Sequence, residues 1–376
     1  MEHYLDNAAT TKPCAEAAAA VMSCISSHYG NPSSLHRKGL EAQHAGEYAR
    51  NQVAGALGCK AQEIVFTSGA TESTNLALCG AAAAYGRKRK KIITSAVEHA
   101  SVRETMAHLE TLGFTVVSVP PAEDGLYHAE DFLKEVDKDT CMVSIMLVNN
   151  ENGYRMPVEE VFRTVKRRDP DIITHCDAVQ GFLKVSFKPR TLCADLVSLS
   201  GHKVHALKGA GALYIRQGVR LKPVLYGSRQ EKGLRPGTEG VPVIAAFGAA
   251  AEKLVLTMDE RYDAVSGLRS SLIEQLKEMD GVIIRDLPSA SPYVLNISLL
   301  GYRSEIVLHY LEQREVYISS GSACSKGASS GVLELFGAKP AEVDSALRIS
   351  FCSDNTEEDI AALVQGLKDA QKDLMH

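Results

Sequence analysis

The fold is decided by the stretch "VSLSGHKVHALKGAGALYIR", residues 197–216. It contains two short apolar runs, and a polar segment carrying Lys203 separates them. Short runs rich in β-branched and aromatic residues predict buried strands rather than helices. Lys203 therefore follows the end of a strand, which is where open α/β sheets bind their ligands.

Five further runs of the same kind precede this stretch, and helical patterns such as "ESTNLALCGAAAAYG" separate them. They read "EIVFTSG", "KIITSAVEH", "TVVSVP", "MVSIMLVNN" and "IITHCDA". Strands that alternate with helices predict a mostly parallel sheet with helices on both faces. We expect a large α/β domain over residues 15–255, built on a mostly parallel seven-stranded sheet.

The pattern changes after residue 255. A long amphipathic helix is followed by the strands "YVLNISLL", "VYIS" and "ALRISF", and a final helix starts at Thr356. This order predicts a smaller α+β domain. The first dozen residues read as extended and are expected to join it, so the second domain comprises residues 1–14 and 256–376.

Composition excludes several classes of protein. The 376 residues carry a formal net charge of -5, so no overall basic character indicates nucleic-acid binding. No apolar run is long enough to span a bilayer, and the N-terminus lacks the pattern of a signal peptide. The nine cysteines are widely spaced with no C-x-x-C pair, which argues against a zinc site and a disulfide framework. We expect no metal, reduced thiols that are mostly inert core residues, and a cytoplasmic location.

Polar residues follow the strands and are expected to converge on one site. Lys203 has the place of an amine nucleophile, because an amine at the mouth of a buried site loses solvation and its pKa falls. The alternative is an ordinary surface lysine. Asp177 could hold the nitrogen of a pyridine ring, with Gln180 reaching the same ring, or it could cap the next helix. His99 could stack on such a ring or be structural.

Two other segments suggest anion binding. "FTSGATES" places Gly69 and Thr71 where a helix begins, which favours a phosphate but is also ordinary helix capping. Ser200 and His202 add donors near Lys203, and Thr238 adds a hydroxyl in "GLRPGTEG". Arg348 lies inside an apolar strand. It is a candidate for holding a substrate carboxylate, and the alternative is an ion pair between two elements.

Cys324 lies in "ISSGSACSKGASSG", residues 318–331. Serine, glycine and alanine in this proportion predict a loop, because glycine frees the backbone and serine competes for its hydrogen bonds. Free cysteines are usually buried like small hydrophobic residues. A cysteine in a polar loop is therefore a candidate for chemistry.

Taken together, these segments resemble a known family. The segments that carry the resemblance are, in order, "YLDNAATT", "YGNPSSLHRKG", "FTSGATESTNLAL", "EHASV", "VNNENG", "CDAVQ", "SGHKVHALKGAGALYIR", "GLRPGTEGVP" and "SSGSACSKG". They resemble the cysteine desulfurases of the NifS/IscS type, within the class V aminotransferase group. The resemblance covers nearly the whole chain.

The resemblance implies a pyridoxal-phosphate enzyme of fold type I that works as a homodimer. Lys203 matches the lysine that forms the Schiff base, and Asp177 matches the partner of the pyridine nitrogen. Gln180 matches the partner of the ring hydroxyl, and His99 matches the stacking imidazole. The positions matched to the phosphate site are Ala70, Thr71, Ser200, His202 and, from the other subunit, Thr238.

The same resemblance implies that L-cysteine is the substrate and that Asn150 and Arg348 hold it. Cys324 matches the cysteine that accepts the sulfur as a persulfide, with release of alanine. A mobile loop would then serve both sulfur abstraction and delivery to an acceptor protein for iron–sulfur clusters or tRNA thiolation. The alternatives are a selenocysteine lyase-like enzyme and a non-catalytic scaffold of the same fold.

Three features depart from the family pattern. The segment after Cys324 is a little shorter than in the long-loop members of the family. Phe351, Cys352 and Ser353 stand where Leu-Gly-Arg is common, and Pro236 stiffens a loop where the family often has serine.

Overall fold

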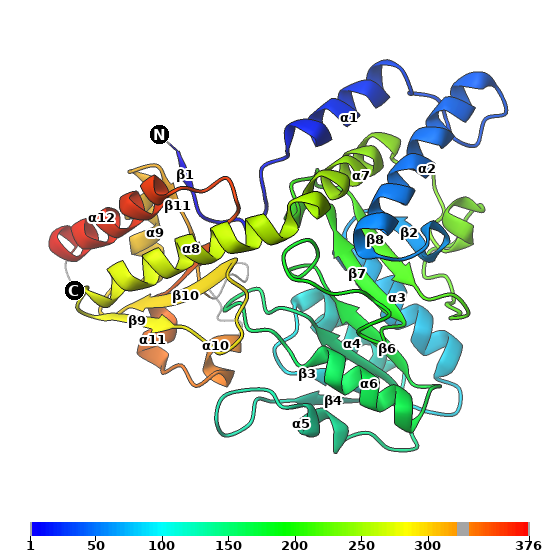
Figure 1. The fold of residues 1–376 in the computed structure, drawn as a ribbon. Helices are drawn as coiled ribbons and strands as arrows, with labels where there is room; N and C mark the ends of the chain where they lie inside the picture. Colours follow the sequence, from blue (N-terminus) through cyan, green and yellow to red (C-terminus); the bar gives the residue numbers. More distant parts are fainter. Residues whose placement is uncertain (1, 322–330, 375–376) are drawn as a thin grey trace.

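The structure is a computed structural model that describes residues 2–321 and 331–374. The larger part of the chain is built on one seven-stranded sheet (Figure 1). The strand order is β2-β8-β7-β6-β5-β3-β4, and β8 alone runs antiparallel to its neighbours. The strands are β2 (Ile64–Thr67), β3 (Lys91–Ser95), β4 (Thr115–Val119), β5 (Thr140–Met146), β6 (Ile173–Asp177), β7 (Leu196–Ser200) and β8 (Gly211–Ile215). The predicted seven-stranded, mostly parallel sheet is confirmed.

Each face of this sheet has its own apolar core, because successive side chains of a strand point to opposite faces. Ile93, Val143 and Val197 belong to one core, whereas their chain neighbours Ile92 and Met142 belong to the other. Strands buried on both faces read as continuous apolar runs, which is why the sequence pattern revealed them.

Helices cover both faces of the sheet (Figure 1). α3 and α4 share one core with the strands, whereas α2, α5, α6 and α7 share the other. α1 packs on α7. The helices of this part are α1 (Ala15–Ser26), α2 (Arg37–Leu57), α3 (Ala70–Tyr85), α4 (Ala100–Thr111), α5 (Ala129–Leu133), α6 (Val158–Arg168) and α7 (Val241–Leu256), with short 3₁₀ turns η1 (Ala61–Glu63), η2 (Gly201–Lys203) and η3 (Gln230–Gly233).

The rest of the chain forms a separate four-stranded antiparallel sheet of order β12-β13-β10-β9 with its own apolar core. Its strands are β9 (Val282–Arg285), β10 (Val294–Leu299), β12 (Ser319–Ser320) and β13 (Ala346–Ser350). The accompanying helices are α8 (Met258–Lys277), α9 (Ser304–Glu312), α10 (Val332–Leu335), α11 (Pro340–Asp344) and α12 (Glu357–Asp373). The N-terminal strand β1 (His3–Tyr4) pairs with β11 (Val316–Tyr317) and so lies beside this layer.

Two details of this smaller layer differ from the sequence-based prediction. The run "VYIS" was expected as one strand, but it divides into β11 and β12 because β11 pairs with β1 while β12 pairs with β13. Strand β9 was not predicted. It is an edge strand of four residues, "VIIR", whose side chains are only half-buried.

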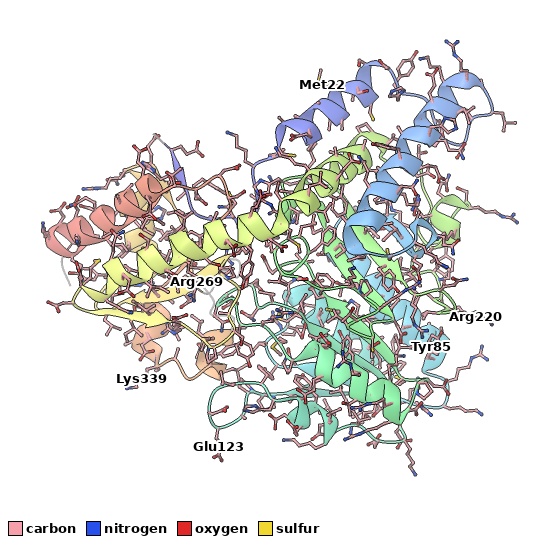
Figure 2. The ribbon with its side chains drawn as sticks, viewed as in Figure 1. Met22, Tyr85, Glu123, Arg220, Arg269 and Lys339 are labelled. Atoms are coloured by element: carbon pink, nitrogen blue, oxygen red, sulfur yellow. The ribbon has the colours of Figure 1, made fainter. Side chains whose placement is uncertain are left out.

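Several apolar side chains on α1 and α2, in the segment between these helices, and in the loop after β8 face outward. Met22 projects from α1 (Figure 2), and Leu35 is fully exposed. The others in this group are Ile25, Tyr29, Leu40, Tyr48, Val224, Leu225 and Tyr226. Exposed apolar side chains gathered on neighbouring elements are typical of a surface that another molecule covers.

Across the described ranges, no single helix is both long and apolar enough to cross a membrane. The helices α7 and α8 pass that test only as a pair, by length and composition, and they are bent by 76° at their junction. The eight cysteines in these ranges are all free. Four of them, Cys24, Cys141, Cys176 and Cys352, are buried, so the expectation of mostly inert core cysteines holds for half of them.

Candidate active site

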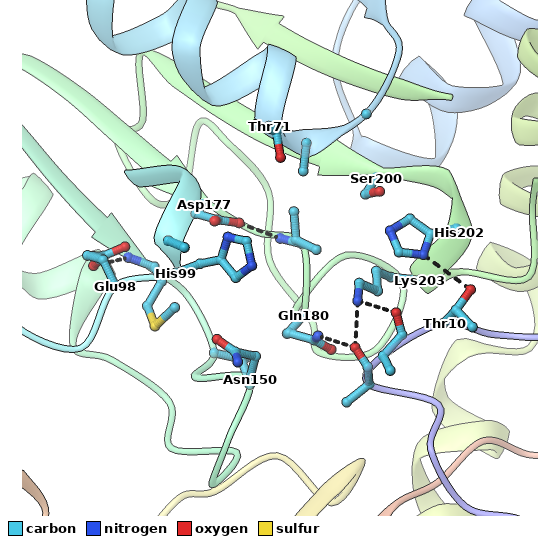
Figure 3. Close-up of a pocket in the computed structure, with 18 of the residues that line it drawn as sticks. Thr10, Thr71, Glu98, His99, Asn150, Asp177, Gln180, Ser200, His202 and Lys203 are labelled. Carbon is cyan, nitrogen blue, oxygen red and sulfur yellow. Dashed lines mark hydrogen bonds between the residues drawn. The ribbon is translucent and has the colours of Figure 1, made fainter. Parts of the chain in front are cut away.

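The loops that follow the strands meet in one cavity of about 650 Å³. The N-terminal segment, which belongs to the other layer, closes one side of it. Ten predicted site residues line the cavity: Ala70, Thr71, His99, Asn150, Asp177, Gln180, Ser200, His202, Lys203 and Arg348. In the view of Figure 3, Thr71 and Ser200 lie at one end and Asn150 at the other, with Asp177, His99 and Lys203 between them.

Lys203 presents its amine to this cavity from η2, directly after strand β7. Its Nζ donates to the carbonyl oxygens of Ala8 at 2.6 Å and Ala9 at 2.5 Å. Burial, and next the positive charge of Arg348, lower the pKa of Lys203 to about 8. An amine with this pKa loses its proton just above neutral pH. Only the unprotonated amine can attack an aldehyde, so Lys203 suits that role.

Asp177 is the last residue of β6 and is buried. Its Oδ1 accepts a hydrogen bond from the backbone N–H of Val179 at 3.0 Å. Burial raises the pKa of Asp177, and nearby His99 works in the opposite direction. A buried carboxyl beside a flat ring nitrogen would favour a protonated nitrogen, because the ion pair offsets the desolvation of both groups.

Glu98 is a second buried carboxyl in the same wall. Its Oε1 accepts from Ser95 Oγ at 2.6 Å and from the N–H of Met146 at 2.9 Å, so it ties the ends of β3 and β5 together. Burial, and to a smaller extent Asp177, raise the pKa of Glu98 to about 8. At neutral pH this carboxyl is therefore mostly protonated.

His99 caps helix α4. Its Nδ1 lies 2.8 Å from Ser101 Oγ and accepts from the Ser101 backbone N–H at 3.1 Å. Burial lowers the pKa of His99, so the ring is neutral at neutral pH. The structural role that the sequence left open is present, and it fixes a flat, uncharged ring against the cavity.

One end of the cavity suits an anion. Helix α3 begins at Ala70, so its first backbone N–H groups lack intrahelical partners and face the loop after β2. Ser200 Oγ is buried and has no hydrogen-bond partner within the described ranges, which leaves a hydroxyl donor free. His202 Nδ1 lies 3.2 Å from Thr10 Oγ1, and burial lowers the pKa of His202 to about 4, so its ring is neutral.

Arg348 lies on β13 and reaches the cavity from the smaller sheet. Its Nη2 forms an ion pair with Asp6 at 3.0 Å, and its Nη1 donates to the carbonyl oxygen of Asn150 at 3.1 Å. The ion pair that the sequence offered as the alternative is therefore present. The buried Nε has no partner among the residues that the structure describes, so one donor of the fork remains free.

Gln180 is held on both sides of its amide. Its Nε2 donates to Ala8 O at 2.9 Å, and its Oε1 accepts from Lys184 Nζ at 3.1 Å. Lys184 is itself buried and was not singled out from the sequence. A lysine four residues after the glutamine is a signal that the sequence did contain.

Two predicted residues are not brought to this cavity. Thr238 is exposed in the loop between η3 and α7, and it is not among the described residues that line the cavity. Cys324 lies outside the described residues. The structure does describe the chain on both sides of its segment: Ser319 pairs with Arg348 across the sheet, and Val332 lines the cavity.

Sequence reasoning also missed the N-terminal contribution. The segment "YLDNAATT" supplies the carbonyl oxygens that hold Lys203 and the carboxylate that holds Arg348. Its letters were visible as a motif, but backbone carbonyl groups have no side-chain signature. Glu98 was likewise visible in "EHASV" and was not singled out.

Comparison with known proteins gives consistent matches. The family model described as "Aminotransferase class-V" matches residues 3–363. A "NifS/IcsS protein homolog" of Lactobacillus delbrueckii subsp. bulgaricus is 40% identical, over 95% of this chain and 94% of that protein. A "Cysteine desulfurase" of Nostoc sp. is 38% identical, over 96% and 91%. A solved structure titled "NIFS-LIKE PROTEIN" superposes with a TM-score of 0.94 at 37% identity and covers 100% of both chains.

Proposed function

This chain belongs to the class V aminotransferase family and is a pyridoxal-phosphate-dependent cysteine desulfurase, and from this premise we propose how its residues divide the reaction. The observation that carries the proposal is the buried amine of Lys203, held between two carbonyl oxygens in a cavity that also presents Asp177 and His99.

The residues present fit the cofactor. An aldehyde needs an amine, a phosphate needs donors, and a pyridine nitrogen needs an acid. Within one cavity, Lys203 supplies the amine and Asp177 supplies the acid. The donors for the phosphate are the start of α3 and the Ser200 hydroxyl, which has no partner among the described residues. The bound cofactor would supply an electron sink that stabilises negative charge at the α-carbon of the substrate.

Lys203 is proposed to move the proton of the substrate's α-carbon. With a pKa of about 8, its amine accepts a proton near neutral pH and returns it readily. Asp177 is proposed to hold a proton at the ring nitrogen, and His99 to keep the ring in place by stacking. The phosphate would be held by backbone groups at Ala70 and Thr71, with Ser200 and His202.

Arg348 and Asn150 are proposed to hold the substrate carboxylate. The guanidinium is positioned by Asp6, and its Nε donor has no partner among the described residues, so it can accept an additional anion. A planar guanidinium binds carboxylates with defined geometry, which would orient the substrate relative to Lys203.

Cys324 is proposed as the sulfur acceptor, on the strength of its sequence segment. Its thiolate attacks the sulfur of cysteine: a sulfur–sulfur bond forms and the carbon–sulfur bond of the substrate breaks. The electron pair of that bond stays on carbon, which is protonated to give alanine, and the sulfur remains on Cys324 as a persulfide. The described residues on either side of the segment lie near the cavity, because Ser319 pairs with Arg348 and Val332 lines the cavity wall, which supports this role.

A homodimer is proposed as the working form. The exposed apolar residues of α1, α2 and the loop after β8 support a covered face, and two-fold dimers are the commonest assembly. Thr238, which does not line the cavity of its own chain, is proposed to complete the phosphate site of the partner subunit.

The persulfide sulfur is proposed to pass to an acceptor protein that serves iron–sulfur cluster assembly or tRNA thiolation. Relatives from Dictyoglomus turgidum and Methanosarcina thermophila carry the name "Cysteine desulfurase IscS". The eight described cysteines are all free, which supports a reducing compartment such as the cytoplasm.

The test is alanine formation from L-cysteine by the purified protein. Lys203→Ala is expected to lose alanine formation and the borohydride-reducible adduct with pyridoxal phosphate, because the variant removes the amine proposed to react with the aldehyde. Lys88→Ala, a change at an exposed lysine, serves as the control and should behave as wild type. Alanine formation by Lys203→Ala at the wild-type rate would contradict the assignment.

A further inference from the structure

Lys184 is a buried ammonium group that the reaction described above does not use. It lies between β6 and β7, is 5% exposed, and follows Leu183, whose backbone has a φ of 59°. Among the residues that the structure describes, it forms no ion pair. A charged group without a counter-ion is costly to bury, so its one side-chain hydrogen bond is informative.

That hydrogen bond connects Lys184 to the cavity. Lys184 Nζ donates to Gln180 Oε1 at 3.1 Å, and Gln180 Nε2 donates to Ala8 O at 2.9 Å. Ala8 O also accepts from Lys203 Nζ at 2.6 Å. Two lysines are thus joined through one amide and one carbonyl, and the bonds from Gln180 and Lys203 to Ala8 O are drawn in Figure 3.

The chemistry of these groups fixes the direction of the amide. An ammonium has three donors and no acceptor, so it can bind only the oxygen of the Gln180 amide. Turning the amide over would set its NH₂ against Lys184 and its oxygen against Ala8 O. Both bonds would be lost, so the Nε2 donor is kept on the side of Ala8 and the cavity.

The other groups around Lys184 do not neutralise it. Lys203 and Arg261 face it as cations, and burial lowers the pKa of His205, so that ring is neutral. Cys352 and Tyr293 also face it, and burial raises their pKa values to about 11 and about 12, so both are uncharged at neutral pH. Tyr293 offers the face of its ring, whose centre lies 5.8 Å from Lys184 Nζ.

The surroundings also act on Lys184 itself. Burial, and next the charge of Lys203, lower the pKa of Lys184 to about 7. More distant Arg348 acts in the same direction. In its neutral form the amine still donates to the Gln180 oxygen. Its preference for that oxygen over the NH₂ group is weaker, because a neutral amine can also accept a hydrogen bond.

We propose that Lys184 is a positioning residue that holds the Gln180 amide with its N–H groups toward the cavity, where they meet the hydroxyl of a bound pyridoxal ring. This inference rests on the proposed function, which places Gln180 at that hydroxyl. Lys184 thereby acts on the cofactor through Gln180 and touches neither the cofactor nor the substrate.

The experiment is a double-mutant cycle on Lys184→Met and Gln180→Met. Two quantities are measured: the dissociation constant of pyridoxal phosphate from the apoprotein, and the pH midpoint of the visible band of the holoprotein. Lys184→Met is expected to weaken cofactor binding about tenfold and raise the midpoint by about one pH unit, because the Gln180 donor that Lys184 holds toward the ring oxygen stabilises the deprotonated form of that oxygen. In the Gln180→Met background the same change should alter binding less than twofold.

Lys166→Met is the matched control. Lys166 is a largely buried lysine that pairs with Asp195, away from Gln180, so its loss should lower the thermal midpoint and leave the band midpoint unchanged. The inference would be overturned, with the proposed function left intact, by either of two results. One is a loss of cofactor affinity in Lys184→Met that adds fully to the loss in Gln180→Met; the other is an unshifted band midpoint in Lys184→Met. A wild type that binds no pyridoxal phosphate would overturn the proposed function and this inference with it.

Discussion

The amine of Lys203 should titrate far below an ordinary lysine in the protein without cofactor. Burial and Arg348 lower its pKa from 10.5 to about 8. At pH 7 this corresponds to about 300-fold more neutral amine than in an exposed lysine, since each pKa unit is a factor of ten. The apoprotein should therefore capture a small aldehyde at Lys203 at a pH where exposed lysines barely react.

The assay treats the apoprotein with acetaldehyde and cyanoborohydride between pH 6 and 11 and quantifies each modified lysine by peptide mass. Exposed lysines such as Lys88 provide the internal standard. Arg348→Met should move the Lys203 midpoint upward by about one unit, because the variant removes a nearby cation and frees the anion of Asp6. Arg269→Met, which breaks an ion pair on α8 away from the cavity, should leave the midpoint unchanged. Capture at Lys203 that follows the pH dependence of the exposed lysines would refute the reasoning.

Three further outcomes are expected. Cys324→Ser should bind pyridoxal phosphate with a normal visible band but form no persulfide and little alanine, measured by persulfide labelling and an alanine assay. Alanine release at the wild-type rate would show that the cysteine is an ordinary loop residue. Thr238→Ala should lose its cofactor faster than the wild type on dilution, while size-exclusion chromatography still shows a dimer. A wild-type protein that is monomeric and fully active would contradict the shared site. Ser200→Ala should weaken cofactor binding about tenfold, through loss of a charge-assisted hydrogen bond, and unchanged affinity would remove Ser200 from the phosphate site.

The large sheet could be predicted from sequence because its strands, apart from the partly exposed edge strand β4, are buried on both faces and read as apolar runs. The convergence of Asp177, Lys203 and His99 followed from the same fact, since the carboxyl ends of parallel strands meet at one edge. Strand β9 was missed although its run "VIIR" is apolar, because the run is short and closely follows the long helix α8.

The parts of the site that escaped prediction are those set by backbone groups and by tertiary partners. The carbonyl oxygens of Ala8 and Ala9 hold Lys203, and any residue type has a carbonyl oxygen. The burial of Lys184 depends on α7, α8 and the residues that follow β13, which no local pattern around residue 184 reveals. The ion pair of Arg348 depends likewise on a residue 342 positions away.

The short N-terminal segment explains why the two layers act as one site. Asp6 forms a bridge with Ser350 beside β13, and its carboxylate holds Arg348. Two residues later, Ala8 O accepts hydrogen bonds from Lys203 and Gln180, which belong to the large sheet. Arg348, proposed to hold the substrate carboxylate, and Lys203, proposed to react with the cofactor, are therefore fixed by the same segment. A displacement of that segment would move both side chains at once, so under the proposed roles the relative position of substrate and cofactor depends on the carboxylate of Asp6 and the carbonyl oxygen of Ala8.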